Sequence, residues 1–492
     1  MILGGAALAF VPGIPTVIFD PQLILVVFLP PLLLSSAYST AWRDFKQNSA
    51  TIISLAVGAV LFTSLSVAVV FHLLFPDLPW AVGFALGAAV SPPDAVAVKA
   101  VLQKLRLPTR VTTVLGGESL VNDASGLVLF HFAVAWTIAG SFNFADALAM
   151  FGMVSIGGII IGYGIGQVGV AVLQRLGSSE LVITGTLLLA ATSYIAAERL
   201  GLSGVLSTVT TGLLLGWRQH EIFSAATRIT AASFWQILVF LLQSMLFILV
   251  GLSLRGTLDR IATTDQMFAD LLVPAGVIIA VVLAARFVWL FGSDILWLGI
   301  GRLGWQLRFK PVFSITTILS WAGIRGPVTL AAALSLPENF PGRDIVLISA
   351  FGVIFVTVLL QGPSLPLLVK ILPSTGSQSS SRLAKDEAQA RMNMSKAQLA
   401  ALSAAFPHPA SNEETCLLEH YRSRASRRAS LLVEDESEKE HLVAQPSAAM
   451  AAAIHAGRAE LLRMYRTGEI SDRVLRKLEQ DLDIQEFGVE TR

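Results

Sequence analysis

Charged residues are scarce in this chain of 492 residues, since Asp, Glu, Lys and Arg together make up 14% of it. Hydrophobic residues make up 54%, a balance that excludes an ordinary soluble domain. Apolar runs of about 20 residues recur along the chain, and a helix of that length crosses a bilayer. The composition therefore predicts an all-α polytopic membrane protein.

Other absences exclude further classes of protein. Cys416 is the single cysteine, which excludes an internal disulfide and a cysteine-based zinc site. The formal net charge is +1, so no basic field is available and no nucleic-acid partner is expected. Neither a nucleophile–base set nor a nucleotide-binding loop occurs. We therefore expect a protein that is not an enzyme and has no cofactor.

The apolar runs predict about 12 membrane segments, of which the first is short. This first run, Met1 to Phe10, is too short to span and lacks a basic start, so it is not a cleavable signal. It is typical of a half-inserted segment or of a helix whose beginning is missing, and we expect an incomplete N-terminus. Residues 1–373 form the predicted transmembrane domain, and residues 374–492 form the predicted C-terminal tail.

Positive charges alternate between the loops. One set of loops is rich in Lys and Arg, including Lys99, Lys104 and Arg106, and the other set is poor. The positive-inside rule places the rich set, and with it the tail, in the cytoplasm of a cell whose plasma membrane the chain spans. The polar, basic segment Trp217 to Thr230 is interpreted as an amphipathic linker at the membrane surface.

Composition changes abruptly after the last apolar run. Ser374 to Ser381 is Ser-rich and is interpreted as a linker. Residues 382–445 are charged and are expected to be partly helical and partly disordered. Helix-period apolar positions between Ala448 and Gln485, with a stop at Gly468, predict a helical hairpin. A regulatory tail and a solvated tail without effect on the membrane domain both stay open.

Two membrane segments are interrupted near their middles, by Ser91-Pro92-Pro93-Asp94 and by Gly323-Ile324-Arg325-Gly326-Pro327. Proline removes a backbone donor and clashes with the preceding turn. Unwound backbone at membrane depth is tolerated where it is buried in protein or lines a wet cavity. A pair of such breaks, one in each half of the chain, indicates the binding site of a transporter. We expect the two broken helices to cross.

The stretch Gly116 to Leu129 carries four polar residues inside an apolar run: Glu118, Ser119, Asn122 and Asp123. Residues four apart lie on one face of a helix. Each ionised residue at membrane depth costs roughly 2.5–3.5 kcal/mol on insertion scales, and such a cost usually marks a function. Together with the breaks, this stretch predicts a ligand set made of oxygen atoms, from Asp94, Asp123, Ser119, a carbonyl freed by Pro93 or Pro92, and Asn122. Hard oxygen ligands suit an alkali cation such as Na⁺.

Two arginines lie in apolar surroundings. Arg325 sits in the second break, and Glu118 is the partner that we expect for it, because either charge left alone at that depth is costly. Arg286 is interpreted as a structural cation that stabilises helix ends or pairs with Asp294.

These motifs carry a family resemblance. The order SPPDAVAV, GGESLVNDASGLVLF and WAGIRGPVTLAAALSLP resembles the sodium/proton exchangers of the cation/proton antiporter-1 family. The early run FLPPLLLSSAYS is also similar to that family, and the close of the tail is similar to bacterial members. The resemblance covers residues 1–373. It implies an inverted-repeat antiporter fold with two crossed discontinuous helices, a dimerisation domain and a core domain that moves against it.

The resemblance also implies roles for particular residues. Asp123 matches the carboxylate that binds the ion and the proton, preceded by Asn122, and Ser119 and Asp94 match further ion ligands. Glu118 and Arg325 match a structural ion pair. The family usually has Thr before the aspartate of the first break and Pro after it, where this chain has Pro93 and Ala95. The family's Thr contributes a backbone carbonyl, which proline keeps.

The leading hypothesis is a monovalent cation/proton antiporter with a role in pH homeostasis, for which Na⁺, Li⁺ and K⁺ all stay open. Because Asn122 cannot take up a proton and the family's Asn-Asp members are electroneutral, we expect one cation to exchange for one proton. A homodimer is implied by the resemblance alone. Two alternatives are a cation channel and a proton-coupled solute symporter. A channel would need a filter sequence, and a symporter would need aromatic contacts, whereas the breaks offer Ala, Gly and Val.

Overall fold

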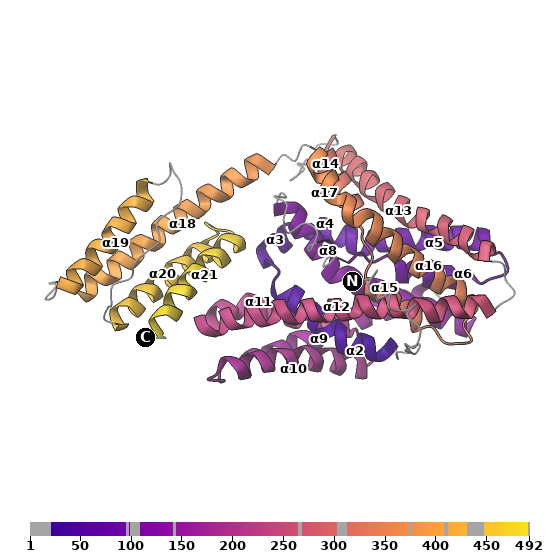
Figure 1. The fold of residues 1–492 in the computed structure, drawn as a ribbon, viewed down its shortest axis with the longest axis horizontal. Coiled ribbons are helices and arrows are strands. Elements are labelled where there is room, and N and C mark those ends of the chain that lie inside the picture. Colours follow the sequence, from indigo (N-terminus) through magenta and orange to yellow (C-terminus); the bar gives the residue numbers. More distant parts are fainter. Residues whose placement is uncertain are drawn as a thin grey trace.

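The computed structural model of the chain describes residues 21–94, 98, 109–140, 144–263, 268–302, 312–372, 376–407, 412–430 and 447–490. Within these ranges every regular element is a helix and no strand occurs, which confirms the all-α prediction (Figure 1). The first apolar run, Met1 to Phe10, lies outside the described residues. Most of the segment between Asp94 and Thr109 also lies outside them.

Two sets of helices follow one another along the chain. The apolar set consists of α2 (Pro21–Tyr38), α3 (Trp42–Gln47), α4 (Ser49–Ile53), the π-helix η1 (Ser54–Ala59), α5 (Val60–Leu74), α6 (Trp80–Val90), α8 (Thr109–Ala139), α9 (Phe144–Leu173), α10 (Ser179–Arg199), α11 (Gly204–Ile222), α12 (Ala225–Thr263), α13 (Phe268–Arg302), α14 (Phe313–Trp321), α15 (Pro327–Leu334), α16 (Arg343–Val356), the π-helix η2 (Thr357–Gln361) and α17 (Gly362–Ile371). The tail set consists of α18 (Gly376–Ala405), α19 (Asn412–Ser430), α20 (Ser447–Thr467) and α21 (Asp472–Glu490).

Seven stretches of the described residues are long and apolar enough to cross a membrane, in agreement with the polytopic prediction. They are Ser49–Leu74, Val111–Ala139, Ala149–Leu173, Ser179–Arg199, Ala225–Leu249, Leu272–Leu296 and Arg343–Ile371. The halves of a broken helix are shorter, since α14 has 9 residues and α15 has 8, whereas a crossing needs about 20. The count of about 12 membrane segments stays a prediction.

The membrane helices form two packed groups. α2, α9, α10, α11 and α12 pack on one another, and we call them the wall group. The crossing group contains both broken helices and consists of α4, η1, α5, α6, α8, α13, α14, α15, α16, η2 and α17. The two groups meet where α2 contacts α8 and α15, and where α12 contacts α15 and α16.

Small residues hold the wall group together. A Cβ atom on Gly162 of α9 would lie 2.7 Å from the Cα atom of Ser207 on α11, so these two backbones touch. The hydroxyl oxygen of Ser193 on α10 lies 2.8 Å from that of Ser207 and 2.9 Å from that of Thr211. In lipid, close backbone packing and interhelical hydrogen bonds replace the hydrophobic effect as the source of helix association. The wall group is therefore a tightly packed unit.

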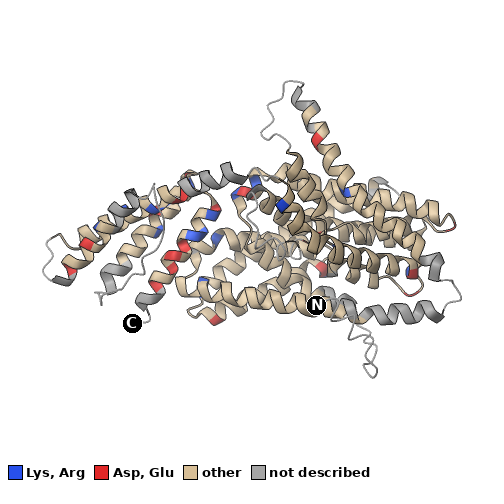
Figure 2. Ribbon diagram, turned by 45° about the horizontal axis from the view of Figure 1, so that its top comes forward, with Lys and Arg blue, Asp and Glu red and all other residues tan. Residues whose placement is uncertain are grey.

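The tail helices form a bundle with an apolar core of their own. α18 packs against α19 and α20, and α20 packs against α21. The turn between α20 and α21 contains Gly468, whose φ of +85° favours glycine. These two helices occupy the region from Ala448 to Gln485 for which a hairpin was predicted. Charged residues gather in the tail and at its junction with the membrane helices, which carry few (Figure 2).

The interpretation of Trp217 to Thr230 as a linker is wrong, whereas its position at the membrane surface stays a prediction. α11 continues to Ile222 and α12 begins at Ala225. This junction is covered by α21, which packs against α12. His220 and Arg228 of the segment thus have acidic partners on a tail helix. The sequence pattern alone does not distinguish such a partner from an anionic membrane.

The Ser-rich stretch Ser374 to Ser381 is also not a simple linker, because α18 begins at Gly376. Later residues of the same helix, Ala390 and Met394, are buried in the bundle core. Packing of one end of a helix can extend it through residues of modest intrinsic propensity.

Candidate functional site

The two interrupted helices meet at their breaks. α6 ends at Val90, and α14 ends at Trp321 before a non-helical stretch that leads to Pro327, the first residue of α15. The backbone N–H of Asp94 in the first break donates to the carbonyl oxygen of Ile324 in the second, over 2.7 Å. The crossing of two discontinuous helices that the Pro and Gly residues predicted is therefore present.

Carbonyl groups of the first break accept hydrogen bonds from side chains. The carbonyl oxygen of Pro93 accepts a hydrogen bond from Nδ2 of Asn122 at 3.0 Å. The carbonyl oxygen of Ser91 accepts from Nη1 of Arg325. Unwound backbone at membrane depth needs such partners. These two bonds join the first break to α8 and to the second break.

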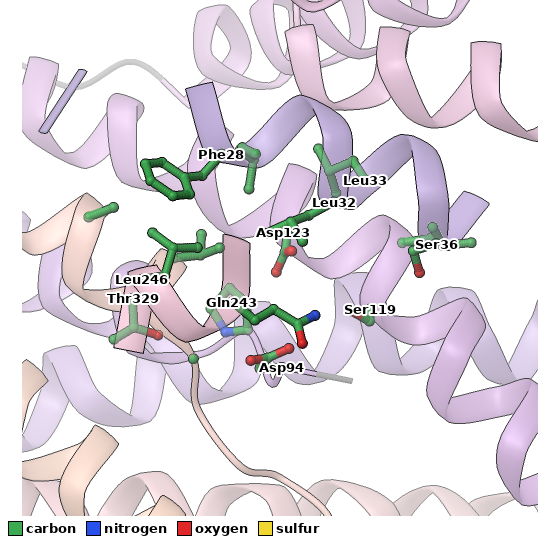
Figure 3. A pocket seen from close by; sticks show the side chains of 16 residues that line it. Phe28, Leu32, Leu33, Ser36, Asp94, Ser119, Asp123, Gln243, Leu246 and Thr329 are labelled. Carbon is green, nitrogen blue, oxygen red and sulfur yellow. The ribbon is translucent and has the colours of Figure 1, made fainter. Parts of the chain in front are cut away.

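A cavity of about 60 Å³ lies beside the crossing, at the interface of the two helix groups. This volume is enough for several water molecules. Figure 3 shows the carboxyl groups of Asp94 and Asp123 in this cavity, with Gln243 beside them. The cavity is lined by Phe28, Leu29, Leu32, Leu33, Ser36, Pro92, Asp94, Ser119, Leu120, Asp123, Gln243, Leu246, Gly326, Val328, Thr329 and Ala331.

Three predicted ion ligands, Asp94, Ser119 and Asp123, thus line one cavity. Ser119 and Asp123 are one helical turn apart on α8, which places both on the face that the cavity exposes. Asp94 comes from the first break, about thirty residues earlier in the chain. The breaks therefore bring together oxygen atoms that the sequence separates. Their binding of an ion stays a prediction.

The other two predicted ligands, Asn122 and Pro93, do not line the cavity. Asn122 is fully buried, with 0% of its surface exposed, and its amide nitrogen bonds the carbonyl of Pro93. Successive residues of an α-helix point about 100° apart. Asp123 can therefore face the cavity while Asn122 faces the break, and the hydrogen bond positions α8 against that break.

The predicted ion pair between Glu118 and Arg325 is wrong, because Glu118 pairs with Arg286. Nη1 of Arg286 lies 2.6 Å from Oε1 of Glu118, and Nη2 lies 2.9 Å from Oε2. Glu118 is 1% exposed and Arg286 is 4% exposed. The pair is bidentate, which is the geometry that a guanidinium and a carboxylate favour.

The surroundings of Arg286 explain this choice. Its Nε donates to the carbonyl oxygen of Leu319 in α14, over 3.1 Å. A Cβ atom on Gly323 would lie 2.7 Å from Cδ of Arg286, so the glycine of the second break leaves room for the arginine stem. The proposed partner Asp294 instead accepts a hydrogen bond from the hydroxyl of Thr316. Arg286 therefore pairs with Glu118 and not with Asp294, and its purely structural role stays a prediction.

Arg325 joins the two breaks at the crossing. It is 2% exposed, and within the described ranges its guanidinium forms no ion pair within 4 Å. Its Nη1 donates to the carbonyl of Ser91, just beyond the C-terminal end of α6, where the helix dipole is negative. Its backbone N–H donates to Oγ1 of Thr357 at 3.1 Å. A positive charge at a helix C-terminus is favourable, and this replaces the expected contact with Glu118.

Gly326 makes close contact between the two breaks possible. A Cβ atom at this position would lie 2.6 Å from the Cβ atom of Asp94, which is shorter than real carbon contacts. The backbone of Gly326 has φ −120° and ψ −170°, a conformation that any residue adopts. The glycine is therefore required by the space that Asp94 occupies and not by backbone strain.

α2 and α12 form a wall of the cavity that was not predicted from the sequence. Leu246 and Gln243 come from α12, and Phe28 comes from α2. Apolar lining residues give no signal in a membrane protein, but Gln243 does, because it is a polar residue within the run ILVFLLQSMLFILV. The rule that singled out Glu118 and Asp123 also applies to an uncharged amide.

Comparison with known proteins gives consistent matches for the sequence. A family model described as sodium/hydrogen exchanger, transmembrane, matches residues 1–371. The sodium, potassium, lithium and rubidium/H⁺ antiporter of Bacillus pumilus is 32% identical over 383 residues, covering 74% of this chain and 56% of that protein. This chain thus spans little more than half of that relative. The uncharacterized Na⁺/H⁺ exchanger YjcE of Escherichia coli is 32% identical over 509 residues, covering 95% of this chain and 89% of the relative.

The fold also has a counterpart among solved structures. The sodium proton antiporter MjNhaP1 from Methanocaldococcus jannaschii, solved at pH 8, aligns with a TM-score of 0.58 at 20% identity. The alignment covers 75% of this chain and 90% of that structure. At this identity the likeness concerns the fold, and it confirms the fold class that the sequence predicted.

Proposed function

Because the chain belongs to the sodium/hydrogen exchanger family, we propose that it is a secondary antiporter that exchanges a monovalent cation for protons. The observation that carries the proposal is the cavity with Asp94 and Asp123 at the interface of two helix groups. Carboxylate and hydroxyl oxygens are ligands of hard cations. Na⁺ is the proposed cation, and Li⁺ and K⁺ belong to the same ligand class.

Competition for Asp123 couples the two fluxes. Its carboxylate is neutralised by a proton or by a cation, but not by both at once. Asp94 and Ser119 complete the ligand set when a cation is bound. A carboxylate that is not neutralised is costly at membrane depth. The site therefore does not change its side of exposure while it is empty. It moves in one direction with a bound cation and in the other direction with a bound proton.

The position of the cavity supports a mechanism of alternating access. The ligands Asp94, Ser119 and Asp123 belong to the crossing group, whereas the apolar lining belongs mainly to α2 and α12 of the wall group. Movement of one group against the other would expose the ligands first to one side of the membrane and then to the other. The packed interior of each group favours movement as a unit.

We propose a stoichiometry of one cation for one proton. Asn122 cannot take up a proton, and Glu118 is engaged by both nitrogens of Arg286, so we place it outside the exchange. Asp94 is proposed to keep its charge throughout the cycle. We further propose a plasma membrane location with a cytoplasmic tail, from the distribution of positive charge, and a homodimer, from the family resemblance.

The test uses purified protein in liposomes that contain a pH-sensitive dye. Addition of external Na⁺ should make the lumen alkaline, because entering cations exchange for internal protons. The same assay with Li⁺ and K⁺ gives the cation preference. A dye signal that does not depend on any added cation would contradict the proposal.

Stoichiometry is tested by imposing a membrane potential in the absence of ion and pH gradients. An electroneutral exchanger should move no protons under these conditions. Proton movement that follows the potential and needs Asp123 would indicate electrogenic exchange. Cation flux that proceeds without any proton flux would indicate a channel.

A further inference from the structure

Gln243 is a polar residue of the cavity that the proposed mechanism does not yet use. It lies on α12, in the wall group, and lines the cavity together with Asp94 and Asp123. Figure 3 shows its amide beside the carboxyl group of Asp94. The neighbouring lining residue on the same helix is Leu246, so the wall group presents this amide from an otherwise apolar helix surface.

The nitrogen of the Gln243 amide is not satisfied by the described residues. Its Nε2 atom is buried and, among the described residues, has no hydrogen-bond partner. A buried donor without a partner is unfavourable unless water or a ligand satisfies it. The side chain of Ser244, by contrast, donates to the carbonyl of Phe240 one turn earlier, over 2.6 Å. The unsatisfied group therefore belongs to the residue that faces the cavity.

An amide offers two functions to such a site. Its oxygen is a hard, neutral ligand for an alkali cation, and its N–H₂ group can donate to a carboxylate or to water. On the basis of the proposed function, we propose that Gln243 is a further residue of the cation site. Its oxygen coordinates the cation, directly or through one water, from the wall side of the cavity.

A neutral ligand of this kind affects cation choice more than proton binding. It adds an oxygen atom to the coordination shell without adding charge, so it changes the size and number of ligands that the cation meets. A proton on Asp123 needs no such shell. Gln243 therefore sets the preference among Na⁺, Li⁺ and K⁺ and leaves the proton affinity of the site largely unchanged.

The experiment compares Gln243→Leu and Gln243→Asn with the wild type in liposomes. Gln243→Leu should raise the half-saturating Na⁺ concentration about tenfold, the effect of losing one polar contact to a charged ligand. The maximal rate and the proton dependence should change little, and the order of preference among the three cations should change. Gln243→Asn keeps the amide on a shorter stem and should lie between the two.

Ser244→Ala on the same helix is the matched control and should behave as the wild type. Stabilisation of detergent-purified protein by Na⁺ against heat gives a second reading of binding that does not depend on transport. Unchanged half-saturation for all three cations in Gln243→Leu, or an equal change in Ser244→Ala, would overturn the assignment. A wild type without cation-dependent exchange would instead contradict the proposed function.

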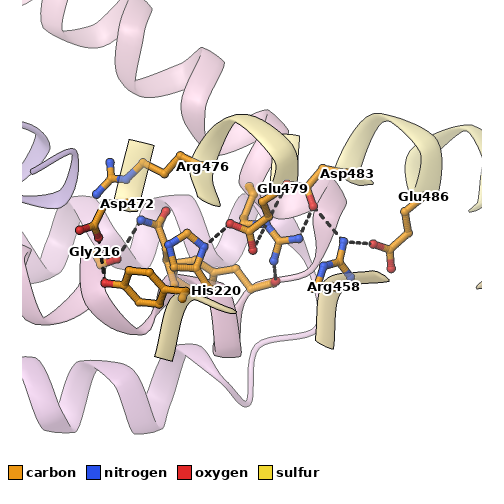
Figure 4. Close-up of polar contacts among 12 residues, drawn as sticks. Gly216, His220, Arg458, Asp472, Arg476, Glu479, Asp483 and Glu486 are labelled. Carbon is orange, nitrogen blue, oxygen red and sulfur yellow. Dashed lines mark hydrogen bonds and ion pairs between the residues drawn. The ribbon is translucent and has the colours of Figure 1, made fainter. Parts of the chain in front are cut away.

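An independent observation concerns the tail, whose last helix is docked on the membrane helices by buried charges. His220 at the end of α11 bonds Oε2 of Glu479 on α21. Arg228 at the start of α12 bonds Asp483 on α21, with 2.8 Å between Nε and Oδ2. The side chains of His220 and Arg228 are 8% exposed, and that of Asp483 is 5% exposed. Figure 4 shows this cluster, in which Arg458 of α20 also reaches Asp483 and Glu486.

Glu479 keeps its negative charge in this cluster. Burial raises the pKa of Glu479, but the hydrogen bond from His220 and the positive charges of Arg228 and Arg458 lower it more. The net pKa lies below the ordinary value, so the group is an ionised partner at neutral pH. A buried charge is costly without its partner, which makes the docked position specific.

A second set of contacts joins the tail to the turn that follows α2 and to α3. Nη1 and Nη2 of Arg476 on α21 donate to the carbonyl oxygens of Ser39 and Thr40, at 2.7 Å and 2.8 Å. The backbone N–H of Arg43 on α3 donates to Asp472 at 3.1 Å, and its guanidinium lies 4.1 Å from the ring centre of Tyr465. α3 in turn packs against α8, the helix that carries Asp123.

The tail therefore contacts helices on both sides of the cavity. α11 and α12, which carry His220 and Arg228, belong to the wall group, and α3 lies against α8 of the crossing group. Movement between the groups cannot preserve both sets of contacts. From this geometry we infer that the docked tail is a brake, which holds the two groups in one relative position until α21 is released.

Charge reversal at the docking face tests this inference. Asp483→Arg should release α21 and raise the exchange rate at saturating cation by about fivefold or more, the lower range of allosteric coupling. Release is measured as faster amide hydrogen exchange in α21. The exchanged pair Asp483→Arg with Arg228→Asp should restore docking and the slow rate. Arg476→Ala provides a second, milder release.

Arg463→Glu is the matched control, because Arg463 pairs with Glu460 and Glu469 on the exposed side of the hairpin. It should alter neither the rate nor the protection of α21. An unchanged or lower exchange rate in a variant whose α21 is demonstrably released would overturn the brake. Restoration of the slow rate by the exchanged pair would support it.

Discussion

Replacement of Asp123 by Asn should abolish cation/proton exchange and leave the protein folded. The two side chains have nearly the same shape, but the amide neither takes up a proton nor offers a full negative charge to the cation. Competition for one carboxylate is the proposed source of coupling. Loss of that carboxylate should therefore remove exchange at every pH, rather than shift its pH dependence.

The measurement is Na⁺-dependent alkalinisation of liposomes, with the melting temperature of the purified variant as the check on folding. Asp294→Asn makes the same chemical change elsewhere among the membrane helices, where the carboxylate accepts from the hydroxyl of Thr316. We expect this control to keep exchange. Clear residual exchange in Asp123→Asn, with the same cation dependence as the wild type, would contradict the assigned role.

Replacement of Glu118 by Ala should destabilise the protein by about 3–5 kcal/mol, since it leaves Arg286 buried without a counter-charge. Arg286 is 4% exposed, so water cannot solvate the guanidinium well. The expected result is a lower yield of folded protein and a lower melting temperature in detergent. Loss of transport should accompany the loss of folded protein.

Double variants identify the true partner of Glu118. Glu118→Met with Arg286→Met removes both charges of the observed pair and should recover much of the stability that Glu118→Met loses. Glu118→Met with Arg325→Met should recover little, because Arg325 bonds the Ser91 carbonyl. Recovery of stability with Arg325→Met but not with Arg286→Met would show that Glu118 pairs with Arg325, as predicted from the sequence.

The fold could be predicted from sequence because its main signals are local. The length of each apolar run predicts a membrane helix. Pro92, Pro93 and Pro327 interrupt the helices, because proline cannot donate the backbone hydrogen bond whatever its neighbours are. The crossing followed from those interruptions, since two unwound segments at membrane depth satisfy each other's backbone groups. The hydrogen bond between Asp94 and Ile324 is an example of that requirement.

The partner of Glu118 could not be predicted in the same way. Arg286 and Arg325 are both buried arginines near the site. The sequence alone does not indicate which of them pairs with Glu118. The choice depends on the space that Gly323 leaves and on which helix end attracts Arg325. Asn122 is different, because the angle between successive helical residues already separates it from Asp123. Because of that angle, Asn122 and Asp123 do not both face the cavity, contrary to the predicted ligand set.

The docking of the tail has no local signal at all. His220 and Glu479 are separated by 259 residues, and a basic segment beside a membrane is equally compatible with lipid headgroups. Gln243 is intermediate, since its polarity within an apolar helix is visible in the sequence but its direction is not. Contacts between distant segments of similar composition thus form the part of the molecule that sequence patterns leave undetermined.

The hydrogen bonds at the breaks have a consequence for the thermodynamics of transport. Asn122 joins α8 to the first break, while Arg325 and Ile324 join the second break to the first. Asp94, Ser119 and Asp123 are therefore held on one rigid frame, and the cation would travel with its ligands instead of passing between them. Such a frame presents the same ligands to both sides of the membrane. The intrinsic affinity of these three ligands for the cation should then be equal on the two sides, and any difference in affinity between the sides would come from the contact with Gln243 of the wall group.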